Sequence, residues 1–309
     1  MKFPALLAAH LAGLATLALP PMAPAQSSRA PGKGVGTLIV AHGGGPVWDA
    51  QVEAVAREVS LEGPVGVSFL MGPGARARRF QDVVRELEQK GAREIVVVPM
   101  LVSSHSGHYE QVRYLVGQRD TLDTLMQHHL HMSGIERPAG SVPLRLAPGM
   151  DDAPEIAGVL ADRARALAPS PAGRALFLVG HGPNSAEDYA AWMTNLRRVA
   201  DTVRVRTGFR SVLVDLVRDD APKDVRAEAV RRVRELITLQ NELTGQPVVV
   251  VPVMVASGKI SREKLPADLA GLPIVYSGDA LLPDAGMARW VESRVRATAA
   301  AHEEVAGTR

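Results

Sequence analysis

The sequence predicts an α/β protein whose parallel sheets are covered by helices on both faces. Strand-like segments such as "TLIV" at 37–40 and "IVVVPMLV" at 95–102 are continuous apolar runs, which is typical of strands buried on both faces. Amphipathic segments, with apolar residues three and four positions apart, lie between these runs. The chain has 309 residues, 46% of them hydrophobic, and is therefore long enough for two domains of ordinary size.

The same pattern occurs twice along the chain. Two pairs of segments carry the repeat: "GTLIVAHGGGP" at 36–46 with "RALFLVGHGPN" at 174–184, and "AREIVVVPMLVSS" at 92–104 with "QPVVVVPVMVASG" at 246–258. Each segment is a strand, followed by His-Gly in the first pair and by small polar residues in the second. We therefore predict two tandem copies of one α/β unit, 36–170 and 171–299, followed by a tail at 300–309.

The composition excludes several classes of protein. The 35 basic and 33 acidic residues are interspersed, so nucleic-acid binding is not expected. The absence of cysteine excludes thiolate metal sites, thiol catalysis and disulfides, and leaves His, carboxylate, Met or backbone oxygen as metal ligands. The chain lacks the nucleophile elbow G-x-S-x-G of serine hydrolases, and it lacks the glycine patterns that bind nucleotides.

The first 25 residues read as a secretory signal peptide. Lys2 precedes an apolar run at 3–19, and Ala23-Pro24-Ala25 fits a cleavage site. An uncleaved anchor helix is the alternative, although the run is short and ends at two prolines. We expect an exported, periplasmic protein with a linker at 26–35 and no stable membrane span after cleavage.

Histidines follow three of the predicted strands. His42 follows the first, His105 and His108 follow the Pro-containing strand, and His181 follows the first strand of the second copy. Ligands of such sheets bind beyond the carboxyl ends of the strands, so convergence of these side chains favours a functional site. The alternative for "AHGGG" is a tight turn in which the glycines only supply positive φ.

The order of these motifs resembles the class II chelatases of the sirohydrochlorin cobaltochelatase and ferrochelatase type. The resemblance rests on "AHGGG", "VGVSFLMGPG" and "KGAREIVVVPMLV" in the first copy and on "GHGPN" and "VVVVPVMVASGKI" in the second. It implies two tandem chelatase-like domains of flavodoxin or Rossmann-like architecture. It further implies that two histidines bind a divalent metal and assist its insertion into a tetrapyrrole. The first is His42; the second is His108 or His105, with His108 preferred.

Imidazole suits this chemistry because it binds borderline ions and accepts protons near neutral pH. The resemblance implies that the metal is a substrate, Co²⁺ or Fe²⁺, with Ni²⁺ or Zn²⁺ as further candidates, and that the other substrate is a tetrapyrrole such as sirohydrochlorin. Glu110 either orders an imidazole or takes a proton, or else it is an exposed acid in the first turn of a helix.

The second copy departs from the family pattern. His181 keeps the first histidine position, but Lys259 stands at the second. A protonated amine is no metal ligand at neutral pH. We therefore expect a degenerate second site and place the working pair in the first copy.

One segment, 117–141, belongs to neither copy. It contains "MQHHLHM" at 126–132, with His128, His129 and His131. Clustered His and Met favour an accessory site for a soft or borderline metal. A surface helix with unrelated histidines is the alternative.

Export leaves two other functions open. Chelatases of this family act in the cytoplasm, so the chain is alternatively an exported metal- or tetrapyrrole-binding protein without turnover, or a structural descendant with neither activity. Formation of a metallated product would distinguish the enzyme from the binding protein.

Overall fold

The computed structural model describes residues 34–140 and 142–307. The predicted signal peptide and nearly all of the predicted linker lie outside these residues. Within them, no helix combines the length and apolar character that crossing a membrane requires.

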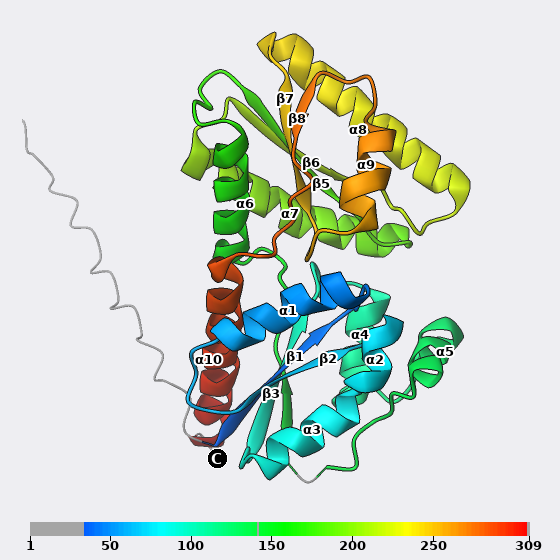
Figure 1. Cartoon of the computed structure of the whole chain (residues 1–309), viewed down its shortest axis with the longest axis vertical. Coiled ribbons are helices and arrows are strands. Elements are labelled where there is room, and N and C mark those ends of the chain that lie inside the picture. Colours follow the sequence, from blue (N-terminus) through cyan, green and yellow to red (C-terminus); the bar gives the residue numbers. More distant parts are fainter. Residues whose placement is uncertain (1–33, 141, 308–309) are drawn as a thin grey trace, which may run out of the picture.

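Two four-stranded parallel sheets form the framework, which confirms the predicted fold class (Figure 1). The first has the order β2-β1-β3-β4 and the second the order β6-β5-β7-β8. The strands of the first are β1 Val35–Ala41, β2 Val65–Phe69, β3 Glu94–Met100 and β4 Leu144–Leu146. Those of the second are β5 Ala175–Gly180, β6 Ser211–Leu216, β7 Val248–Val253 and β8 Ile274–Tyr276.

Helices connect the parallel strands, as such connections require. In the first half they are α1 Pro46–Glu58, α2 Gly72–Ala77, α3 Phe80–Gln89, α4 Gly107–Leu115, α5 Thr124–Ser133 and α6 Pro154–Leu167. In the second half they are α7 Ala186–Thr207, α8 Lys223–Thr244, the π-helical turn η1 Ile260–Lys264, α9 Leu265–Asp268 and α10 Ala285–Gly307.

The central strand pairs of the two sheets share one register. Val40 pairs with Pro99 in the first sheet, and Val179 pairs with Pro252 in the second. Each proline lies beyond the last residue paired with the short outer strand β4 or β8. The missing proline N–H therefore removes no hydrogen bond from that outer ladder. The matching positions give the two sheets equivalent carboxyl edges.

Two helices cross between the halves. Helix α6 follows the first sheet in sequence but packs on α7 and β7, whereas α10 packs on α1, β3 and β4 (Figure 1). Arg163 of α6 donates to the carbonyls of Ala280, Leu281 and Pro283 in the second half. Arg294 of α10 donates to the carbonyls of Gly149 and Met150 in the first half. The crossing makes the main hydrophobic core continuous through both halves.

Candidate functional site

His42 lies directly after β1, in a turn that requires glycine. Gly43 has φ +90°, and a Cβ atom there would lie 2.2 Å from the Met71 carbonyl oxygen. His42 Nδ1 is 2.7 Å from the carbonyl oxygen of Gly43. A carbonyl only accepts hydrogen bonds, so Nδ1 carries the proton and the Nε2 lone pair of a neutral His42 is free.

His108 is the second residue of α4, whose first turn is capped by the side chain of Ser106. The His108 Nδ1 atom is 2.8 Å from Oε1 of the fully buried Gln111. The other end of that amide, Nε2, donates to the carbonyl of Met126, also at 2.8 Å. This second bond orients the amide, so Oε1 accepts from His108 Nδ1–H and the His108 Nε2 atom is free to bind a ligand.

The two rings meet edge to face, with centroids 4.5 Å apart and planes at 86°. Burial lowers the pKa of His42, and burial together with the nearby His42 lowers the pKa of His108 to about 4. Both imidazoles are consequently neutral at pH 7, which is the form that binds metal. The structure thus brings together two of the histidines predicted from the sequence.

His105 and Glu110 lie outside this pair. The His105 side chain is exposed, and its main-chain carbonyl accepts a hydrogen bond from the Trp192 indole. Glu110 forms ion pairs with Arg113, at 3.2 Å, and with Arg119. The contact that orders the His108 imidazole is made by Gln111, which the sequence analysis missed. Its position three residues after His108 on one helix face was the available signal.

The second half places His181 in the position equivalent to His42. Its Nδ1 atom is 2.8 Å from the Gly182 carbonyl, and its Nε2 atom is 3.1 Å from Asp220 Oδ2. Burial is the largest single influence and opposes the positive charge on His181. The hydrogen bonds with Asp220 and the Gly182 carbonyl, together with the charges of Asp220 and Asp219, outweigh burial and raise the His181 pKa. His181 is therefore more basic than His42, and its Nε2 atom is already bonded to Asp220.

His181, Asp219 and Asp220 offer three ligand atoms within 4.8 Å of one another. Asp219, however, is neutralised by Arg226 at 3.1 Å and by Lys264 at 2.5 Å. These cations disfavour a further positive ion there. The lysine that reaches this cluster is Lys264, whereas the predicted Lys259 is exposed. The two aspartates were not identified from the sequence.

The carboxyl edges of the two sheets face each other. The indole of Trp192, from α7, donates to the main chain of His105, and the Asn195 amide donates to Asp151 at 3.3 Å. The charge of His181 lowers the pKa of His42, and that of Asp220 raises it. The two histidines that follow the first strands therefore belong to one electrostatic environment.

Helix α5, from the segment outside the repeat, brings one of its three histidines to the pair. The His129 ring lies over His108, with centroids 6.5 Å apart and planes at 23°. Its Nδ1 atom is buried and has no hydrogen-bond partner among the described residues. His128 and His131 are exposed. Only one of the three residues predicted for an accessory site therefore joins His42 and His108.

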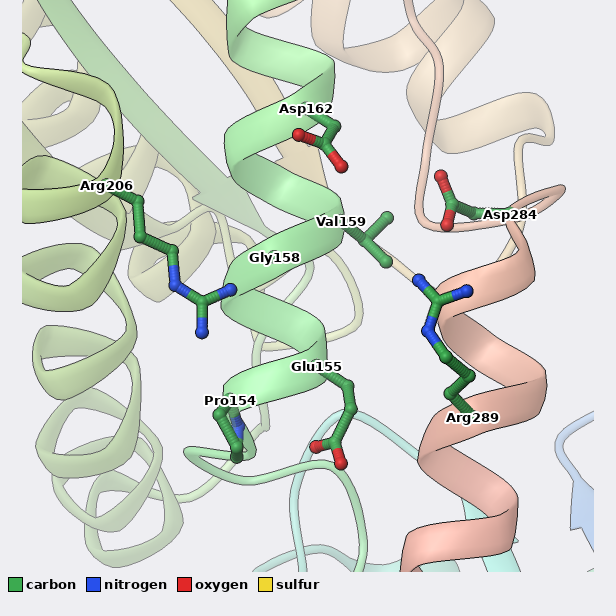
Figure 2. Close-up of a pocket in the computed structure, with 8 residues that line it drawn as sticks. All are labelled: Pro154, Glu155, Gly158, Val159, Asp162, Arg206, Asp284 and Arg289. Carbon is green, nitrogen blue, oxygen red and sulfur yellow. The ribbon is translucent and has the colours of Figure 1, made fainter.

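A separate pocket of about 330 Å³ lies beside α6 and α10 (Figure 2). Figure 2 shows Arg206 and Arg289 on opposite sides of α6. The remaining lining residues are Pro154, Glu155, Gly158, Val159, Asp162 and Asp284. None of the histidines described above lines this pocket, and it mixes three carboxylates with two guanidinium groups. We therefore assign the site to the histidines between the sheets.

The first half of the chain matches a known protein family. Residues 36–167, from β1 through α6, match the CbiX family model. These residues form a CbiX-family domain. The match confirms the resemblance to class II chelatases, and the domain contains His42, His108 and His129. No curated protein matches the sequence.

Solved structures of low sequence identity share the fold. SirB from Bacillus subtilis with Fe³⁺ is 16% identical, with a TM-score of 0.58, over 87% of this chain and 97% of SirB. A multi-domain protein from Deinococcus radiodurans, DR2241, described as structurally similar to chelatases, is 20% identical, with a TM-score of 0.52, over 85% of this chain and 54% of its own. The similarity to SirB covers 87% of this chain, so the shared fold continues beyond residues 36–167 into the second half.

We expect Gly43→Ala to destabilise the protein more than Gly45→Ala. Both glycines have positive φ, but only a Cβ atom at Gly43 would strike the main chain, since nothing lies within 4 Å of one at Gly45. Strain of about 1–3 kcal/mol is common to both substitutions, and the clash adds to it at Gly43. Urea unfolding of the two variants measures the difference. Equal losses would show that the turn does not have the described close approach.

The pH dependence of stability should report the half-buried, neutral His108. Its pKa of about 4 lies below the ordinary 6.5, so the unfolded chain binds more protons between these values. The free energy of unfolding should fall as the pH is lowered from 6.5 to 4, by about 3 kcal/mol from this residue. His108→Gln should flatten that dependence in urea unfolding, and the exposed His105→Gln should leave it unchanged. Equal pH profiles for both variants would contradict the assignment.

Proposed function

We propose that the protein inserts a divalent metal ion, cobalt or iron, into a tetrapyrrole such as sirohydrochlorin. The observation that carries the proposal is the pair of neutral imidazoles, His42 and His108, at the carboxyl edge of a CbiX-family domain. Hydrogen bonds at both Nδ1 atoms leave both Nε2 atoms free for an incoming ion. Two imidazoles leave at least half of the coordination positions of the ion to water and to the substrate.

The reaction removes two N–H protons from the tetrapyrrole and transfers the ion to the ring nitrogens. Each imidazole that releases the ion regains a lone pair and accepts one of these protons. The low pKa of His108 favours onward transfer of its proton to water at neutral pH, which returns the residue to its metal-binding form. Two ligands that bind the ion and then take up protons are sufficient for one cycle.

We further propose that the protein acts after export, in a periplasm. The support for this location is the sequence of residues 1–25, with its basic start, apolar run and small residues before the expected cleavage point. Export also favours the second candidate, a protein that binds metal or tetrapyrrole without turnover. Product formation separates the two.

The test uses purified protein, Co²⁺ or Fe²⁺, and sirohydrochlorin, with the visible absorption change on metallation as the signal. His42→Ala and His108→Ala should each lower the rate by at least about tenfold, because each removes a ligand and a proton acceptor. His105→Ala is the matched control in the same segment and should retain the rate. His181→Ala should also retain it, since the His181 Nε2 atom is occupied by Asp220.

Equal loss in all four variants would contradict the assignment of the working half. Stoichiometric binding of cobalt without metallated product, under conditions in which the tetrapyrrole itself remains intact, would select the binding protein instead.

A further inference from the structure

We propose that His129 on α5 is a third ligand for the metal ion that His42 and His108 bind. This inference rests on the proposed function for the role of the ion as substrate, but the ligand set is testable on its own. The segment that carries α5 lies between α4 and β4, and the second half has no helix at the corresponding place between α9 and β8 among its described residues. The third ligand is therefore a feature of the first half alone.

The chemistry of the His129 side chain supports a ligand role. Its Nδ1 atom is buried and lacks a hydrogen-bond partner among the described residues, a state that is unfavourable for a polar atom. When Nε2 carries the proton of a neutral imidazole, Nδ1 presents a lone pair to an ion. A metal ion beside His108 would satisfy that atom.

The distances place His129 just outside direct coordination. With metal–nitrogen bonds of about 2.1 Å, the centroids of two imidazoles on a tetrahedral ion lie roughly 5 Å apart. The His42 and His108 centroids, at 4.5 Å, are close to this separation, and those of His108 and His129, at 6.5 Å, exceed it. The two rings are nearly parallel, and a ring-nitrogen lone pair lies in the plane of its ring, so a rotation of the His129 side chain must accompany an inward movement of about 1–2 Å to complete a three-imidazole site.

The contacts between α5 and α4 link such a movement to the existing pair. Gln111 bonds to the His108 ring and also to the main-chain carbonyl of Met126 on α5. The Met126 side chain packs against Gly107, where a Cβ atom would lie 2.7 Å from its sulfur. The first turns of α4 and α5 thus form one packed unit around His108.

The helix supplies its own controls. His128 and His131 flank His129 on the same helix but are exposed, whereas Leu130 is buried against the core. All three residues are histidines of the same helix. Substitutions at 128 and 131 therefore test whether metal binding depends on His129 itself or only on the number of histidines in α5. Of the three, only His129 stacks its ring with that of His108.

The experiment is a Co²⁺ titration of the purified protein, followed by the visible d–d absorption of the bound ion and by isothermal calorimetry. His129→Ala should weaken cobalt binding at least tenfold and change the d–d spectrum, because one nitrogen ligand is replaced by water. His128→Ala and His131→Ala should match the wild type in both readouts. His129→Gln, which keeps much of the volume, should reproduce the effect of His129→Ala, with circular dichroism checking that both variants are folded.

Wild-type affinity and spectrum in folded His129→Gln would overturn the inference. So would equal weakening by all three alanine substitutions, which would indicate a non-specific histidine cluster.

The metallation assay separates this inference from the proposed function. Metallation with His129→Gln indistinguishable from wild type at limiting cobalt would overturn the third ligand and leave the chelatase. His129-dependent cobalt binding without any metallation by wild type would leave the ligand set and overturn the chelatase. When both hold, His129→Gln should raise the KM for cobalt and change kcat little, because the ion leaves His129 before insertion.

Discussion

The parallel pairing of β1 with β3 is the constraint on which the site depends. The register runs from Val35 opposite Glu94 to Ala41 opposite Met100, so both strands end at the same level. His42 is the next residue after one strand, and the start of α4 follows the other within a short loop. A slip of one residue would turn every side chain of a strand to the opposite face. Burial of both strands therefore fixes the positions of the two imidazoles as well as the packing of the core.

The same pairing in the second sheet leads to different chemistry. His181 has the same backbone hydrogen bond as His42, yet its other nitrogen faces a carboxylate instead of a second imidazole. Both aspartates at that edge already have hydrogen-bonded partners: Asp220 is bonded to His181, and Asp219 to the cations Arg226 and Lys264. A metal ion between the sheets thus meets the unbonded Nε2 atoms of His42 and His108 on one side and hydrogen-bonded carboxylates on the other. This difference in hydrogen bonding favours the first half as the metal-binding side.

The sequence was sufficient for the framework because continuous apolar runs and a repeated order of motifs do not depend on side-chain detail. His42 followed from the rule that parallel strands end at one edge. The choice between His105 and His108 depended on the start of α4, which is set by the Ser106 cap and could not be read from apolar periodicity. Gln111 was missed because a neutral amide carries no sign of its partner, although it lies one turn from His108.

Helix phase explains the mixed outcome for the histidines of α5. Successive helical residues are about 100° apart, so a run of histidines cannot all face one site. Only the half-buried His129, beside the buried Leu130, reaches His108. The exchange of α6 and α10 was equally hidden, since an amphipathic pattern shows that one face is buried without showing which sheet covers it.

That exchange gives the second half a structural role that does not require a metal ligand of its own. Helix α10 packs on β3 and β4, and Arg294 holds the loop that follows β4. Removal of the second half would uncover the apolar strand that precedes His108 and would free the loop at Gly149. Helix α6 and Arg163 make the reciprocal contacts with the second half. Each sheet therefore depends on a helix from the other half, and the edge that carries His42 stays opposite the edge that carries His181.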